Sequence, residues 1–385
     1  MRHTRWIILI ILFLSCFSIE ANASDIDTIL EEQMAIIDFE EIDAVLGQDY
    51  IWDYFNVANF QELLTQLIKG ELDFSLISFM EHFLNTFLKE LNALGILMGE
   101  IIVLAVMSQI LKNIDVSFKK TAVGEMGFYV VYVTLILILF KSFDVVIDLV
   151  TGTINELYAL MESILPTMLM LVMVSGNITA GTAQGTAVLF TLEVLVNIIK
   201  TYILPIIYFI VILELINNIS KQDILSHLLS FVKVVINKAL KYTIVVFSLI
   251  MSVTNIIPNM VDGIINKGAK YAMSSIPVVG TALSGVVDTV LNCSVLIKNS
   301  VGIGAIIIIL IMCIIPVIKL LAIYFIYKIS ASLVQPLADE RIVKGLSGIG
   351  DYSGMLLGVL ITVMVLFIAS ITILVTTTNM TMMMR

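Results

Sequence analysis

The chain has 385 residues, of which 59% are hydrophobic and only 14% are charged, and its formal net charge is −10. Soluble proteins carry about 45–50% apolar and about 25% charged residues, so this composition excludes an ordinary soluble domain and indicates a membrane protein. Residues 24–90 hold fifteen acidic side chains but only two lysines, which predicts an acidic region outside the membrane. Nucleic acid is excluded as a partner, because phosphate binding needs a basic patch.

The first 23 residues have the order of a secretory signal peptide. Arg2 and Arg5 form a basic start, residues 6–17 form an apolar run, and Ala21-Asn22-Ala23 is a small-x-small site. This order predicts cleavage after Ala23. An uncleaved anchor helix is one alternative, and a lipoprotein with Phe13-Leu14-Ser15-Cys16 as its lipobox is a weaker one, because Phe13 replaces the usual aliphatic residue. In each case, residue 24 begins outside the cytoplasm.

Residues 24–90 predict a small region of short amphipathic helices. Apolar side chains recur at helical spacing from Phe60 to Leu67. Asn59 or Asn56 is the expected N-cap of the second short helix, and Gly70 its expected end. The region is expected to pack on itself or on the membrane. A docking surface for another exported protein is the alternative.

Residues 91–375 predict an all-α, polytopic membrane bundle, followed by a short tail over residues 376–385. Loops 112–121, 217–238 and 328–352 carry lysines or arginines and are therefore placed inside, with residues 24–90 and the C-terminus outside. Six apolar segments long enough to cross a bilayer are expected at residues 91–111, 122–140, 186–216, 239–257, 301–327 and 353–375.

Two further apolar segments are interrupted by proline, which disfavours helix in the residue before it. The segments around Pro166 and Pro277 are therefore predicted to be re-entrant, entering and leaving on the exported side. Pro166 and Pro277 are separated by 111 residues, as are Pro205 and Pro316, and G-x-I-N at residues 152–155 recurs at 263–266. This offset predicts two parallel tandem repeats related by an axis along the membrane normal.

Several charged side chains fall inside the predicted membrane segments. Charge at that depth is costly and usually faces a bundle interior or a water-filled path. Glu193 and Lys200 lie seven residues apart and so share a helix face, and Glu193 is expected to point into the bundle. Lining of a conduit and a structural ion pair remain alternative interpretations. The candidate conduit residues are Glu100, Glu162, Glu193, Lys200, Glu214 and Lys319.

Gly350, Gly354 and Gly358 are spaced by four residues, which places glycine along one helix face and permits close helix approach. Packing within one chain is the expected role, with homo-oligomerisation as the alternative. The residues expected to shape helix packing are these three glycines together with Pro166, Pro205, Pro277 and Pro316.

Catalytic and metal-binding signatures are missing from the sequence. It contains no HExxH, Walker A or GxSxG motif, and its three histidines are too scattered for a zinc site. Cys293 and Cys313 are expected to be buried as small hydrophobic residues. We therefore expect no enzyme activity, no cofactor and no catalytic site.

Three segments resemble a known family: residues 276–302 (IPVVGTALSGVVDTVLNCSVLIKNSVG), Pro316–Lys319 and Gln335–Asp339. They are similar to the stage III sporulation protein AE family, as is the order of signal peptide, acidic exported segment and polytopic body. The threonine- and methionine-rich tail after Val375 matches no family motif.

The resemblance implies a multi-pass protein of the mother-cell membrane around the forespore. It implies membership of a channel or secretion-like complex that joins the two cells. Its partners would be the other stage III sporulation A-type membrane proteins and a forespore-side membrane protein. The family has no established catalytic residues to transfer. A self-contained transporter or permease, and a non-conducting membrane scaffold, are the alternative functions.

Overall fold

The computed structural model describes residues 34–35, 37–46, 57–72, 76–118, 121–219, 225–274 and 279–383, and every regular element in this part of the chain is helical. The predicted signal peptide and Pro277 lie outside it. Two short helices, α3 (Phe39–Leu46) and α5 (Phe60–Lys69), come first. The long elements are α6 (Leu76–Phe118), α7 (Thr121–Val174), α8 (Ile178–Ile198), the π-helix η1 (Ile199–Ile203), α9 (Leu204–Asn217), α10 (Ser226–Ser274), α11 (Val279–Val334) and α12 (Glu340–Met383).

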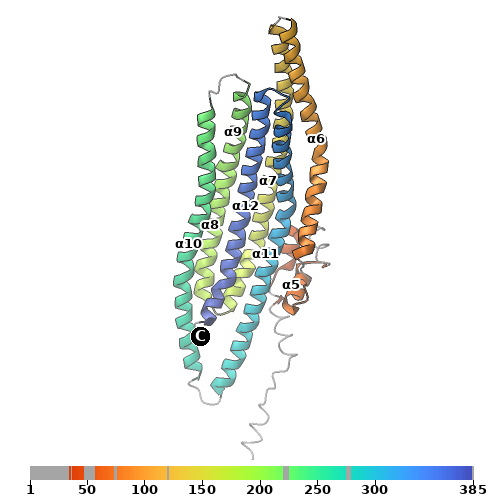
Figure 1. The fold of residues 1–385 in the computed structure, drawn as a ribbon. Helices are drawn as coiled ribbons and strands as arrows, with labels where there is room; N and C mark the ends of the chain where they lie inside the picture. The colour runs from red at the N-terminus through yellow and green to blue at the C-terminus, as the bar shows by residue number, and fades with distance from the viewer. Residues whose placement is uncertain are drawn as a thin grey trace, which may run out of the picture.

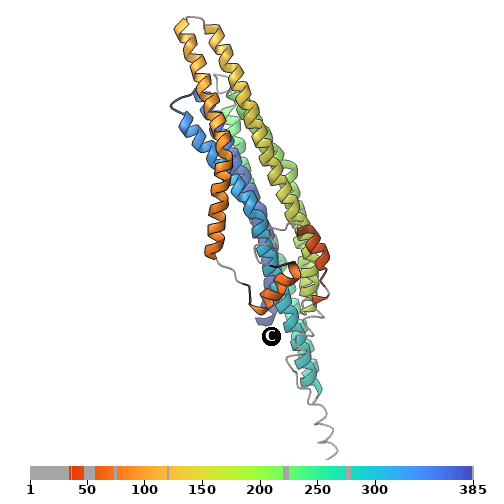
Figure 2. The same ribbon diagram turned by 90° about the vertical axis from the view of Figure 1, so that its right-hand side faces the viewer.

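The long helices form an elongated bundle of six passages that alternate in direction, with α8, η1 and α9 together making the third passage (Figure 1). All six contain segments long and apolar enough to span a membrane, which confirms the expected polytopic helical bundle. The number of membrane crossings stays a prediction. α5 and the end of α12 lie in the same half of the bundle as the α10–α11 end, and the α6–α7, α9–α10 and α11–α12 connections lie toward the opposite end (Figures 1 and 2). This arrangement matches the predicted grouping of loops. Which end is cytoplasmic stays a prediction.

The short helix α5 has the predicted boundaries. Asn59 is its N-cap and accepts a hydrogen bond from the Glu62 N–H at 2.9 Å, and Gly70 ends it in the left-handed conformation at φ 70°. Its buried side packs on α11 at Gly304, where an added Cβ would lie 3.2 Å from Phe60. Part of the acidic N-terminal region is therefore docked on the bundle.

The helix α7 corrects the prediction of a re-entrant segment at Pro166. The 54 residues of α7 form one helix about 81 Å long at 1.5 Å per residue, and Pro166 lies inside it. Its ring is exposed, while neighbouring Leu165 and Met168 are buried. The missing Pro166 N–H removes one helical hydrogen bond, but packing along the buried face keeps the helix continuous. The chain turns back only after Val174.

The close approach of α11 and α12 explains two of the three spaced glycines. An added Cβ at Gly350 would lie 3.3 Å from Lys328, and one at Gly354 would lie 3.2 Å from Tyr324, both on α11. No atom lies within 4 Å of the corresponding position at Gly358. The close helix approach expected of these glycines is therefore seen at Gly350 and Gly354 but not at Gly358.

The tandem repeat stays a prediction. Pro205 stands at the start of α9, directly after η1, whereas Pro316 is buried inside the continuous helix α11. The third passage and α11 do run in the same direction, as parallel repeats require (Figure 1). The two prolines nevertheless have different local backbones.

Candidate functional site

Side-chain contacts establish which residues lie at the same depth along the bundle. Thr377 of α12 donates to Gln184 of α8 at 2.5 Å, and Tyr352 of α12 donates to Glu214 of α9. The apolar stretch of α12 between residues 353 and 375 is therefore level with residues 185–213 of the third passage. Glu193 and Lys200 lie within this apolar layer.

Lys200 belongs to η1, the π-helical turn in the third passage. Its Nζ donates to Asn155 Oδ1 on α7 at 2.5 Å. Single π-helical turns inside α-helices often occur at functional sites, because the extra residue redirects side chains. Here the turn places an ammonium group beside the polar middle segment of α7.

Further polar side chains continue this contact in both directions. Tyr208 of α9 donates to Asp144 of α7 at 3.3 Å, beside a cavity of about 270 Å³ that also borders Thr151, Lys200 and Pro205. In the other direction, Tyr158 lies within hydrogen-bonding reach of Glu162 and within electrostatic range of Glu193. We call this strip the polar groove; its residues are Asp144, Asp148, Asn155, Tyr158 and Glu162 of α7 with Glu193, Lys200 and Tyr208 of the third passage.

The polar groove opens on the outside of the bundle. Glu162 and Glu193 are both exposed, so the prediction that Glu193 points into the bundle is wrong. The reason is that α8 buries the other side of its surface, including Val188 and Leu192. Ionised groups facing hydrocarbon cost about 2.5–3.5 kcal/mol each on insertion scales, so such a surface calls for a protein or water neighbour.

Glu214 belongs to a separate polar network near the opposite end of the third passage. It accepts from the Tyr352 hydroxyl and forms an ion pair with Lys233 of α10 at 2.9 Å. Lys233 also lies 4.3 Å from the centre of the Tyr352 ring. The network borders a cavity of about 330 Å³ and joins α9, α10 and α12.

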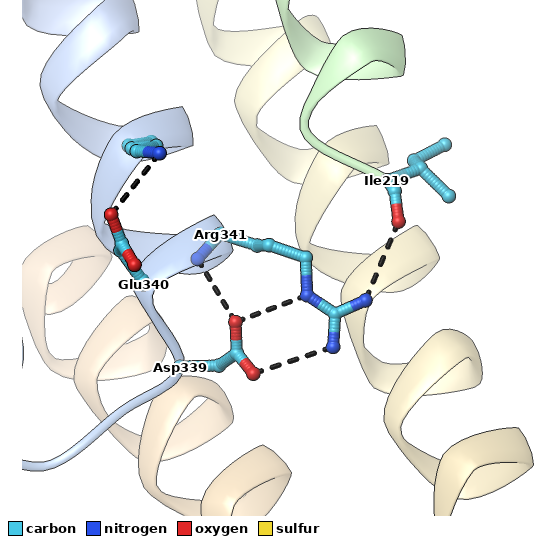
Figure 3. A network of polar contacts seen from close by, with 5 residues as sticks. Ile219, Asp339, Glu340 and Arg341 are labelled. Atoms are coloured by element: carbon cyan, nitrogen blue, oxygen red, sulfur yellow. Dashed lines mark hydrogen bonds and ion pairs between the residues drawn. The ribbon is translucent and has the colours of Figure 1, made fainter. Parts of the chain in front are cut away.

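A third network fixes the start of α12 and includes the last residue of the Gln335–Asp339 segment. Arg341 Nε and Nη2 donate to the Asp339 carboxylate at 3.0 and 3.3 Å, and Nη1 donates to the Ile219 carbonyl at 3.4 Å (Figure 3). The guanidinium group also lies 3.9 Å from the centre of the Phe128 ring on α7. This arrangement clamps the α9 end, the α12 start and α7 together, which is a structural role.

The remaining predicted residues are not brought into the polar groove. Glu100 is exposed on α6 and Lys319 is half-buried on α11. The sequence reasoning missed two buried charged residues: Asp262, which accepts from the backbone of α8 at 2.7 Å, and Lys298, which donates to the Val375 carbonyl at 2.6 Å. Lys298 lies inside the family-like segment 276–302, which could have drawn attention to it.

The described residues contain no group of three or more histidine, cysteine, aspartate or glutamate side chains arranged to hold a metal ion. The polar side chains of the networks described above join helices to one another, and those of the polar groove face the outside of the bundle. In chemical terms, the arrangement is suited to helix association and to contact with water or protein.

Comparison with known proteins gives a specific match. The family model of stage III sporulation protein AE matches residues 58–378. Stage III sporulation protein AE of Bacillus subtilis (strain 168) is 28% identical over 323 residues, which is 84% of this chain and 81% of that protein. No solved structure matches.

Proposed function

Because the chain belongs to the stage III sporulation protein AE family, we propose that it is a membrane subunit of the complex that joins the mother cell to the forespore. The family supports a role in sporulation, and the six apolar helical passages make the chain a multi-pass membrane protein. The proposal adds the mother-cell membrane around the forespore as its location. It also adds the other stage III sporulation A-type proteins and a forespore-side membrane protein as partners.

The observation that carries the proposal is the exposed polar groove at the depth of the apolar layer. Glu193 and Lys200 lie level with the apolar stretch of α12, yet Glu193 is exposed on the bundle surface. A single chain surrounded by lipid would leave this charge against hydrocarbon. An assembly that covers the groove with protein or hydrates it removes that cost. We propose no catalytic step.

The test is co-purification from sporulating cells. A tagged full-length chain replaces the family member of a spore-forming host, and the membrane proteins that co-purify with it are identified. Glu193→Gln is expected to lower both co-purification and spore yield at least tenfold while membrane insertion is unchanged. Glu340→Gln is the matched control. Glu340 is exposed and pairs with Lys344 on α12, and such surface ion pairs contribute little to stability.

Two results would contradict the proposal. One is the absence of any co-purifying sporulation membrane protein with the wild-type chain. The other is solute transport by the purified chain alone in liposomes, which would identify a self-contained permease.

A further inference from the structure

The helix α10 presents basic side chains on the outside of the bundle. Lys238 and Lys241 are both exposed, and within the described part of the chain neither forms an ion pair. The polar groove, by contrast, has an acidic excess: Asp144, Asp148 and Glu193 are exposed along it. The two surfaces therefore carry opposite charge.

The depth of the lysines follows from two contacts between α10 and the third passage. Glu214 pairs with Lys233, and at the far end the Ala180 N–H donates to Asp262. Lys241 follows Lys233 by eight residues on α10. Because α10 and the third passage are antiparallel, Lys241 lies level with a residue that precedes Glu214 by a similar distance. Lys241 is therefore level with Pro205.

The depth of the acidic residues follows in the same way. Asp144 contacts Tyr208, and Asn155 contacts Lys200, so Asp148 also lies level with Pro205. The cavity beside Pro205 is bordered by residues 144, 147 and 151 of α7, which agrees with this level. Asp148 and Lys241 thus lie at one depth on different faces of the same bundle, as do Asp144 and Lys238.

We propose that the polar groove of one copy receives α10 of a second copy, with Lys241 facing Asp148 and Lys238 facing Asp144. Equal depth is the decisive feature, because copies related by rotation about the membrane normal meet only at equal depth. Such a contact is head-to-tail, and its repetition gives a ring when the rotation between neighbouring copies closes. Ion pairs formed there are shielded from lipid. Exposed apolar residues of α10, such as Tyr242 and Leu249 (63% and 62% exposed), extend the contact.

This inference rests on the proposed function in one respect, namely that an assembly covers the groove. The covering partner proposed here is a second copy of this chain, so the interface forms without any other sporulation protein. The experiment can therefore be done in non-sporulating cells, where the other proposed partners are absent.

The test uses two differently tagged full-length chains, each with a single cysteine, in a background with Cys16, Cys293 and Cys313 replaced by alanine. One chain carries Asp148→Cys and the other Lys241→Cys. A thiol-specific bifunctional cross-linker added to membranes is expected to give a covalently linked dimer containing both tags, because residues 148 and 241 face each other across the proposed contact at the distance that an aspartate–lysine ion pair spans. Neither chain can form an internal cross-link.

The matched control pairs Lys241→Cys with Glu162→Cys, which also lies in the groove. Residue 162 is fourteen residues from residue 148, or about 21 Å along the helix at 1.5 Å per residue. This pair is expected to give at least tenfold less dimer. In a second arm, Asp148→Lys should weaken the oligomer, and Lys241→Asp in the same chain should restore it.

Three results would overturn the inference. The first is no mixed dimer from Asp148→Cys and Lys241→Cys when both chains insert at wild-type levels. The second is a strong product between two Asp148→Cys chains, which would mean a symmetric interface. The third is an oligomer that does not respond to the charge reversals. If cross-linking fails while sporulation proteins still co-purify with the wild-type chain, another subunit covers the groove and the proposed function stands.

Discussion

Asp262 of α10 caps α8 at Ala180, whose backbone N–H donates to the carboxylate at 2.7 Å. The Thr179 N–H donates to the other carboxylate oxygen at 3.1 Å. A helix start leaves its first N–H groups without helical partners and carries partial positive charge. A carboxylate stabilises it both by accepting hydrogen bonds and by its negative charge. The cap comes from a different helix, 82 residues away, and therefore also fixes α10 against α8.

Replacing Asp262 tests this link. Asp262→Ala removes both accepted hydrogen bonds and is expected to lower the free energy of unfolding by about 0.5–2 kcal/mol, the usual cost of losing a cap. Asp262→Asn keeps one oxygen acceptor and should lose less. Thermal unfolding of the detergent-purified full chain measures both. Lys267→Ala, an exposed change on the same helix, serves as the control, and equal stability of all three variants would contradict the capping role.

Gly348 leaves the space that Glu214 occupies. A Cβ added at Gly348 would lie 2.6 Å from Glu214 Oε1, so Gly348→Ala must displace the carboxylate that holds Lys233 and Tyr352. The free energy of unfolding is expected to fall by about 1–3 kcal/mol, because the displaced carboxylate weakens its contacts with Lys233 and Tyr352. Unfolding in detergent is again the measurement.

Gly358→Ala is the matched control for Gly348→Ala. Both glycines lie in α12, but no atom lies within 4 Å of the added Cβ at Gly358. Alanine there only improves helix propensity, by about 1 kcal/mol at most. The stability of the two variants should therefore change in opposite directions, and a loss at Gly358 equal to that at Gly348 would show that the contact between Gly348 and Glu214 is not what matters.

The sequence predicted well those features that depend on composition and local pattern. Apolar length predicts the six passages, and the Asn59 and Gly70 signals predict both ends of α5 because caps are local chemistry. The placement of Glu193 beside Lys200 on one side of the third passage also follows from helical spacing. Which side of α8 is packed depends on the neighbouring helices, so the spacing alone could not show that Glu193 is exposed.

The remaining errors have the same origin. Pro166 disfavours helix locally, but packing of the buried face of α7 outweighs one lost hydrogen bond. Asp262 is inconspicuous in the sequence, because its partner is the backbone of a helix 82 residues away. The continuity of α7 and the role of Asp262 therefore depend on contacts between residues far apart in the sequence, which local sequence patterns do not reveal.

Phe60 anchors α5 to the bundle. Its side chain is fully buried, and it faces Gly304 of α11. Phe60→Ala is expected to weaken docking by about 3–5 kcal/mol, as for other buried Phe→Ala changes. Hydrogen exchange of residues 60–69 should accelerate, whereas exposed Gln61→Ala should leave it unchanged. Unchanged protection in Phe60→Ala would show that α5 is held by other contacts.

Asp43 makes the docking of α3 on α5 depend on pH. Burial raises the pKa of the Asp43 carboxyl above its ordinary value of 3.8, although the Phe60 N–H, which donates to it at 3.0 Å, partly opposes the shift. Between the ordinary and the raised value, the docked state binds more protons than the undocked state, so the stability of docking falls as pH rises through this window. Hydrogen exchange of residues 39–46, corrected for its intrinsic pH dependence, should show this loss of protection. Asp43→Asn should abolish it, and because Glu40 and Glu41 remain in that variant, an unchanged pH profile would assign the effect to them instead.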